Sequence, residues 1–271
     1  MRTGIRILII LGLAFHVFPQ VDLSKDTLGL EINSKILIVG EDLTYVVKYA
    51  FFRLGEVRFK VVEKTNIRDI TVYKTIAYID SYPDLPFVSI HQIYESYIDS
   101  TLFPLLFIAR IFGEKDTTYV KYSFIDDSKI EIQKGNYETS TVWLDSTKYT
   151  NKRLQDGLSI LFFARMNFGR DRTVHVPCFV NEKEEITKIN FFTGKEPVSI
   201  DAVEYDIDCL RLDGETKFAS VYGLTGYFEG WFSNDALYVP ILAKMNVIIG
   251  SVTLELIKWN KELWNPPSYT N

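Results

Sequence analysis

The sequence predicts an all-β fold, mainly antiparallel, in which a meander forms a barrel or an open half-barrel with one or two short helices. Three observations support this prediction. Apolar and polar residues alternate along many short segments, which is the period of a half-buried strand. Turn-forming residues separate these segments, and strands do not alternate regularly with helices. Sequential strands joined by short turns pair in an antiparallel manner.

The clearest strands lie near the C-terminus, in residues 227–233 and 247–259. In both segments alternate positions are apolar, and the second has one nearly all-aliphatic face. Short polar side chains at 233–235 and the group 244–246 predict the two connecting turns. Pro240 lies between these turns and predicts an edge strand, a bulge or a strand end, because proline cannot donate a backbone hydrogen bond.

The same alternation recurs through the rest of the chain. Glycine in the sequence Arg53-Leu54-Gly55 predicts a hairpin turn there. About fourteen short strands result, at residues 31–39, 43–52, 56–64, 70–79, 117–125, 129–133, 139–144, 173–180, 185–192, 198–205, 207–212, 227–233, 237–242 and 247–259.

Two segments have helical periodicity instead. Residues 154–168 give the stronger signal, because Leu158, Leu161 and Phe162 share one helical face. Asp156 precedes them and is expected to cap the helix. Residues 88–98 carry apolar side chains at a similar spacing, so a short amphipathic helix is expected there.

The N-terminus has the pattern of a secretory signal peptide, which we place at residues 1–20. Arg2 and Arg6 accompany an apolar run at 5–18 that is too short to span a membrane. An uncleaved anchor or a buried first strand is the alternative. Cleavage would leave one β-rich domain at 21–271, exported to the periplasm or outer membrane of a Gram-negative bacterium, or outside the cell. No later apolar run is long enough to be a transmembrane span.

The charge argues against nucleic acid as a partner. The formal net charge is −5, and it becomes −7 when Arg2 and Arg6 are removed. Nucleic-acid binding depends on Lys and Arg side chains that neutralise phosphates.

We predict no metal, no cofactor and no catalytic residues. His91 and His175 are isolated, and no zinc-type spacing, nucleophile elbow or phosphate-binding glycine loop occurs. Asp206 and Asp208 alternate on one strand and could hold calcium with Glu204, but the ligand spacing of a calcium loop is missing.

Cys178 and Cys209 could form a disulfide in an oxidising compartment. The predicted strands that carry them are separated by at least one other strand, whereas a disulfide needs Cα atoms within about 7 Å. Two buried thiols are the alternative that this placement favours.

The aromatic content raises the possibility of an apolar cavity. The chain has 19 Phe, 16 Tyr and 4 Trp, and a barrel or half-barrel of this size can enclose an apolar space. Candidate lining residues are Phe52, Phe162, Phe192 and Trp231. Packing in a filled core is the interpretation that we favour for these side chains, and a cavity is the alternative.

Three groups of residues resemble one bacterial family. They are 40–45 (GEDLTY), then 156–159 (DGLS) with 162–165 (FFAR), and finally 231–235 (WFSND) with the residues up to 251. In this order and spacing they resemble the domain-of-unknown-function 3108 family of exported proteins, over about residues 40–256. The sequence departs from that pattern in having two phenylalanines at 162–163 where tyrosines are expected, and in Asn234 between the serine and the aspartate.

The resemblance implies an exported, largely β protein and supplies no established activity, so no functional residue follows from it. The sheet is similar, by fold-level analogy alone, to the open half-barrels of periplasmic lipoprotein carriers.

We therefore predict a non-catalytic cell-envelope protein that binds an apolar small molecule, such as a lipid, or an envelope protein partner. Two other functions stay open. A hydrolase of envelope polysaccharide would need two carboxylates about 5 to 10 Å apart. A structural or assembly factor would have a filled core and an exposed apolar patch.

Overall fold

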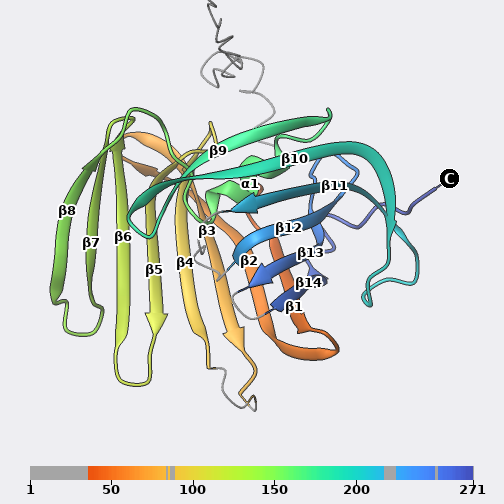
Figure 1. Cartoon of the computed structure of the whole chain (residues 1–271), viewed down its shortest axis with the longest axis horizontal. Helices are drawn as coiled ribbons and strands as arrows, with labels where there is room; N and C mark the ends of the chain where they lie inside the picture. Colours follow the sequence, from red (N-terminus) through yellow and green to blue (C-terminus); the bar gives the residue numbers. More distant parts are fainter. Residues whose placement is uncertain (1–35, 84, 86–88, 217–223, 248–249, 271) are drawn as a thin grey trace, which may run out of the picture.

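The computed structural model describes residues 36–83, 85, 89–216, 224–247 and 250–270, which form one antiparallel sheet of 14 strands (Figure 1). The strand order is β8-β7-β6-β5-β4-β3-β2-β1-β14-β13-β12-β11-β10-β9. The bounds are β1 Asp42–Tyr49, β2 Phe52–Ile67, β3 Ile70–Ser81, β4 His91–Asp99, β5 Pro104–Phe112, β6 Thr117–Asp126, β7 Lys129–Asn136, β8 Val142–Tyr149, β9 Arg172–Val180, β10 Lys183–Val198, β11 Ile207–Thr216, β12 Leu224–Ser233, β13 Pro240–Val247 and β14 Gly250–Trp259.

The sheet is an open half-barrel with β8 and β9 as its edge strands, and β9 also forms an isolated parallel bridge between Cys178 and Gln155. In Figure 1, β4 to β8 stand side by side as one row, and β9 to β14 run across that row at a steep angle. Side chains of β6 and β7 contact the turn between β9 and β10. The Tyr122 hydroxyl donates to Glu182 at 2.7 Å, and Lys134 pairs with the same carboxylate at 2.7 Å. These side chains join β6 and β7 to the β9–β10 turn, and backbone hydrogen bonds between Gln155 and β9 add a second connection.

The segment between the two halves forms the helix α1 (Ser159–Arg165). Asp156 begins it, because its Oδ1 accepts hydrogen bonds from the N–H groups of Leu158 at 2.8 Å and Ser159 at 2.6 Å. These groups would otherwise lack acceptors at a helix start. Asn167 ends the helix, since its side-chain amide donates to the Phe163 carbonyl at 2.6 Å. The predicted cap is therefore confirmed, in a helix shorter than the predicted 154–168.

Arg165 fixes the position of α1. Its side chain is 0% exposed, and its guanidinium donates to both carboxylate oxygens of Glu41, at 2.7 and 2.8 Å. Its Nε donates to the Leu237 carbonyl at 3.0 Å. Glu41 directly precedes β1, and Leu237 lies between β12 and β13. The helix is thereby held at the end of the half-barrel where β1 begins.

Apolar side chains between the two halves form the core. Tyr94, Phe107 and Tyr122 stack along the inner side of β4, β5 and β6, and Phe179 of β9 packs edge-on against Tyr122 at 5.0 Å between ring centroids. A second cluster surrounds Phe168 beneath β9 to β12. Burial of each such ring contributes about 1.5–3 kcal/mol.

The prediction of an all-β, antiparallel fold is confirmed, and the barrel is open. The expected helix at 88–98 is wrong, because this segment forms β4, hydrogen-bonded to β3 and β5 on its two sides. Tyr94, Ser96 and Ile98 of β4 are buried at alternate positions. Apolar residues on both faces of a central strand imitated the helical spacing.

The turn predicted at 53–55 is also misplaced. Tyr49 pairs with Phe52, so the hairpin turns at Ala50 and Phe51, and Gly55 lies within β2. A Cβ added at Gly55 would lie 2.1 Å from the Asp80 carbonyl oxygen of β3. This glycine therefore permits a close approach of two strands.

Other strand bounds differ from the expected ones. The strand expected at 139–144 begins at Val142 instead, because the Asn136 side chain accepts from the Thr139 N–H and holds a turn. β10 runs on to Val198, and residues 199–206 form no strand. β13 runs through the expected turn at 244–246.

The predicted signal peptide at 1–20 and most of the strand expected at 31–39 lie outside the described residues. Within the described parts, no helix has the length and apolar character needed to cross a membrane.

Candidate functional site

A cavity of about 560 Å³ is lined by β1 to β3, α1 and β9 to β14, whereas β4 to β8, which are described in full, contribute no residue to its wall. It is open to solvent on part of its surface. Most of the wall is aliphatic, as shown by Val47 of β1, Ile79 of β3, Leu212 of β11, and Val252 and Leu254 of β14. Pockets for small molecules typically measure about 300–1,000 Å³ and are mostly apolar. The cavity therefore has the size and chemistry of a site for an apolar ligand.

Helix α1 covers one end of the cavity. Ile160, Leu161 and Ala164 line the covered end. The lining then extends along the strands, away from the start of β1, as far as Leu54 and Val247. Because Arg165 holds α1 near the start of β1, we place the mouth at the far end of β1.

A few polar groups line the cavity near α1. Asp156, Cys178 and Thr187 are all buried. Burial raises the pKa of Asp156, although Ser96 donates to its Oδ2 at 2.5 Å and two backbone N–H groups donate to its Oδ1. Burial also raises the pKa of the Cys178 thiol to about 12. A thiol with such a pKa is a poor nucleophile at neutral pH.

Three other carboxylates belong to the cavity wall but are engaged elsewhere. Glu56 accepts from the Tyr82 hydroxyl at 3.0 Å, Asp80 pairs with His91, and Glu229 pairs with Arg211 at 3.2 Å. The residues on either side of each carboxylate line the cavity. Because side chains alternate along a strand, the three carboxylates point to the opposite face of the sheet. No Lys, Arg or His is found in the described part of the lining.

The four aromatic residues expected at a cavity lie outside this lining. Phe52 is 60% exposed beside the β1–β2 turn, and Phe162 packs on the other side of α1 with Ile36 and Leu37.

Phe192 and Trp231 lie on the outer face of the sheet. The Arg211 guanidinium covers the Phe192 ring at 4.3 Å, and the Trp231 indole donates to Glu196 at 2.7 Å. Trp231 is opposite Arg211 in the register, whereas the neighbouring Gly230 lines the cavity.

The residues that line the cavity are mostly aliphatic, and some of them could be recognised from the alternation of apolar residues in the sequence. Val252 and Leu254 alternate along the aliphatic face predicted for 247–259. The aromatic content of the sequence does not indicate these residues, because they are aliphatic.

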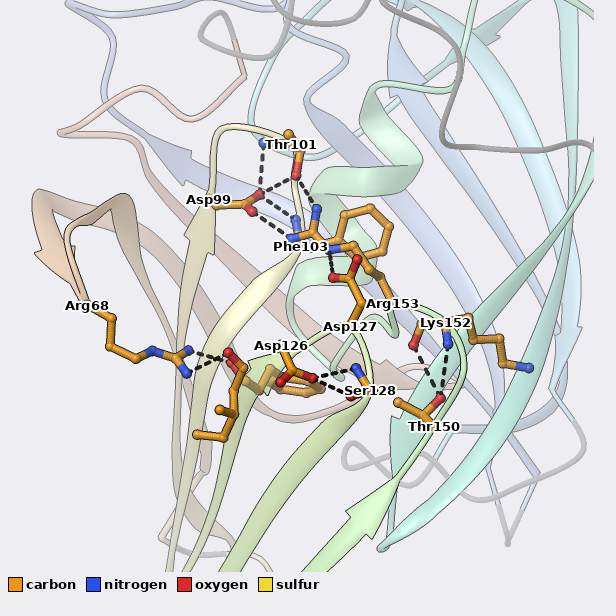
Figure 2. Close-up of polar contacts among 12 residues, drawn as sticks. Arg68, Asp99, Thr101, Phe103, Asp126, Asp127, Ser128, Thr150, Lys152 and Arg153 are labelled. Atoms are coloured by element: carbon orange, nitrogen blue, oxygen red, sulfur yellow. Dashed lines mark hydrogen bonds and ion pairs between the residues drawn. The ribbon is translucent and has the colours of Figure 1, made fainter.

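A second cavity of about 110 Å³ lies where the turns after β2, β4 and β6 meet (Figure 2). Arg153 is the centre of its polar contacts. It donates to Asp99 at 2.6 Å and to Thr101 at 2.8 Å, pairs with Asp127 at 3.3 Å, and lies over the Phe103 ring at 4.1 Å.

Arg68 extends this network from the turn between β2 and β3 (Figure 2). Its guanidinium donates to the Ile125 carbonyl at 2.9 Å and to the Phe124 carbonyl. The charged groups of this second cavity thus pair with their own neighbours, which holds the ends of three hairpins together and leaves no set of free donors for a ligand.

The titratable residues considered for metal binding are dispersed. His91 pairs with Asp80, and His175 is exposed on β9. The Asp206 carboxylate accepts from Ser199, whereas Asp208 pairs with Lys195 at 3.3 Å. In the described ranges, no three His, Cys, Asp or Glu side chains lie close enough to hold a metal ion.

Both cysteines are free and buried. Cys178 is on β9 and Cys209 on β11, and β10 lies between these strands. Strands are spaced about 4.8 Å apart, so the two Cα atoms are too far apart for a disulfide.

Two solved structures were compared with the chain. A β-barrel-like protein of the DUF1849 domain of unknown function, from Brucella abortus, matches with a TM-score of 0.55 at 12% identity, over 82% of this chain and 98% of that one. This likeness shows the fold alone. A candidate exported protein with a YmcC-like fold, from Bacteroides fragilis, has a TM-score of 0.33 at 8% identity, over 82% of this chain and 96% of that one, and carries no argument.

Among curated proteins, no sequence matches the chain. The family model described as "Protein of unknown function (DUF3108)" matches residues 44–257, which confirms the resemblance found in the sequence. The chain belongs to the DUF3108 family, whose members are proteins of unknown function.

Proposed function

We propose that this protein is a non-catalytic protein of the cell envelope that holds one apolar molecule, such as the alkyl chain of a lipid, in the half-barrel. The observation that carries this proposal is the open cavity of about 560 Å³ with its aliphatic wall. A space of this size exposes much apolar surface to water, and an apolar ligand would remove that surface from water at about 25 cal/mol per Å².

The distribution of charge supports an apolar ligand. The described lining holds no cationic side chain that could pair with a carboxylate or phosphate, and Asp156 is occupied in capping α1. An ionised group placed in the cavity would therefore be unpaired and costly. A charged headgroup is expected to stay outside, at the mouth.

Export remains part of the proposal. It is supported by the basic and apolar pattern of residues 1–20, and it implies one mature domain at 21–271. The proposed location is the periplasm or the outer membrane, with the outside of the cell as the alternative.

Binding can be tested with a neutral naphthylamine dye whose fluorescence rises in apolar surroundings. The wild-type protein is expected to bind it, and the substitution Ile160→Trp, which places a bulkier ring in the cavity, is expected to weaken binding about 10-fold or more. Val252→Trp places the same ring on β14 and gives a second variant in case the first disturbs α1. Ile186→Trp is the matched control, because Ile186 is exposed on β10 and does not line the cavity.

Native mass spectrometry of protein from its own host complements the dye assay. An apolar molecule that co-purifies with the wild type and is lost from Ile160→Trp is expected. If the wild type neither binds the dye nor carries such a molecule, the proposal is wrong.

A further inference from the structure

The turn between β1 and β2 displays aromatic side chains to solvent. Phe51 is 86% exposed and Phe52 is 60% exposed, and their rings touch with centroids 5.0 Å apart. Tyr49, on the other side of the turn, is 41% exposed. We call these three residues the aromatic tip. Three large apolar side chains that adjoin on one turn form a patch, unlike the scattered exposed residues that are normal on protein surfaces.

The aromatic tip lies at the mouth of the cavity. Val47 and Leu54, two residues before Tyr49 and two after Phe52, both line the cavity. Val252 on the adjoining strand β14 lines it as well, and Lys48 pairs with Thr253 in the register of β1 and β14. The apolar wall of the cavity therefore continues along the hairpin to the exposed rings, at the end away from α1.

A cation accompanies the aromatic rings. Arg53 follows Phe52 directly, is exposed, and forms no ion pair with any described residue. Aromatic rings with an adjacent basic side chain are the combination found where proteins enter the membrane–water interface. There the rings leave water while the guanidinium stays among anionic headgroups.

We propose that the aromatic tip docks the protein onto an anionic lipid surface and seats the mouth of the cavity against it. An apolar molecule could then pass between bilayer and cavity without crossing water. This inference rests on the proposed function. A lipid surface is favoured over a protein partner because one two-residue turn is far smaller than the roughly 800 Å² per partner of a stable protein interface, whereas two or three rings suffice for weak, reversible membrane binding.

Co-sedimentation with vesicles tests the docking. The wild-type protein is expected to bind vesicles of phosphatidylcholine mixed with phosphatidylglycerol, more weakly those of phosphatidylcholine alone, and less in high salt because of Arg53. The double substitution Phe51→Ser with Phe52→Ser is expected to weaken binding about 10-fold or more. Arg53→Gln should remove most of the difference between the two vesicle types.

Tyr149→Ser is the matched control. Tyr149 is 76% exposed on the edge strand β8, far from β1 in the strand order. This variant should sediment with vesicles as the wild type does. Equal binding by the wild type and the Phe51→Ser, Phe52→Ser variant, or no binding of the wild type to either vesicle, would overturn the inference, and the latter result would leave a protein partner for the tip.

The dye assay distinguishes failure of membrane docking from failure of the proposed ligand binding. The Phe51→Ser, Phe52→Ser variant should bind the naphthylamine dye like the wild type, because neither ring lines the cavity. Dye binding without vesicle binding refutes the docking alone. Absence of dye binding refutes the cavity function, on which this inference depends.

Discussion

Arg165 and Glu41 are a buried, bidentate pair that joins residues 124 positions apart in the sequence. Charged groups lose solvation when buried, and their attraction compensates only while both are present. The Arg165 side chain is 0% exposed, its guanidinium donates hydrogen bonds to the Glu41 carboxylate and the Leu237 carbonyl, and it lies 5.6 Å from the centroid of the Phe162 ring.

We expect Glu41→Gln to lower the free energy of unfolding by about 3–5 kcal/mol, because it leaves the Arg165 charge buried and unpaired. The double substitution Glu41→Leu with Arg165→Met should recover most of that loss. Urea denaturation of the two variants measures both effects. A single variant as stable as the wild type would show that water reaches the guanidinium.

Asp156 is a buried carboxyl whose titration should affect stability. Burial raises its pKa above the value of the unfolded chain, so the folded protein favours the protonated form. Its stabilising contribution is therefore fully present below the unfolded pKa of about 3.9 and is lost as the pH rises through the raised folded pKa.

We expect Asp156→Asn, which keeps an acceptor oxygen and cannot ionise, to gain stability relative to the wild type as the pH rises from acid to neutral. Asp156→Ala should be less stable than Asp156→Asn by about 1–2 kcal/mol at every pH, since the N–H groups of Leu158 and Ser159 lose their acceptor and neither variant ionises. Chemical denaturation over a series of pH values gives both trends. A constant difference between wild type and Asp156→Asn would contradict the raised pKa.

At the scale of elements, the three sequence groups of the family resemblance meet around α1. Glu41 belongs to the first group and Arg165 to the second. In the third group, Asp235 accepts from the Leu237 N–H at 2.9 Å and from the indole of Trp264 at 2.7 Å, and so shapes the loop that presents the Leu237 carbonyl to Arg165. These residues position the helix that covers one end of the cavity, which is a structural role.

Substitution of Gly55 tests whether this residue lies within β2, as in the structure, or in a turn, as the sequence predicts. In a turn, alanine at this position would be tolerated. Within β2 its Cβ would meet the Asp80 carbonyl oxygen at 2.1 Å, so Gly55→Ala should destabilise the fold by about 1–3 kcal/mol. Gly194→Ala is the control, because a Cβ there meets nothing within 4 Å. Thermal unfolding compares the two, and equal midpoints would argue for the turn.

Most elements followed from local patterns, and the errors have local causes as well. β4 was mistaken for a helix because a central strand has apolar residues on both faces, which conceals the alternation. The turn at Ala50 and Phe51 was missed because it contains no glycine or other strong turn residue. Asp156 was correctly expected to cap the helix because capping depends on residues two and three positions away.

At the scale of the whole molecule, the sequence left a filled core and an apolar cavity both open for its aromatic residues. Of the four candidate lining residues, Phe192 and Trp231 lie on the outer face, Phe52 is exposed beside the β1–β2 turn, and Phe162 packs on the other side of α1. Which of two adjacent residues points inward depends on the register, and a shift of one residue reverses it. The register shifts within β1, β10 and β12 cannot be read from composition.

The sequence by itself determined that this chain forms antiparallel strands with apolar inner faces and one capped helix, because those features depend on residues a few positions apart. Only the tertiary structure decided that the sheet stays open and that its interior is partly hollow. The same inward aliphatic side chains could fill a core or line a cavity. The outcome depends on how β1 to β3 and β9 to β14 are spaced around the cavity and on where α1 lies, and contacts between distant parts of the chain, such as Arg165 with Glu41, fix the position of α1.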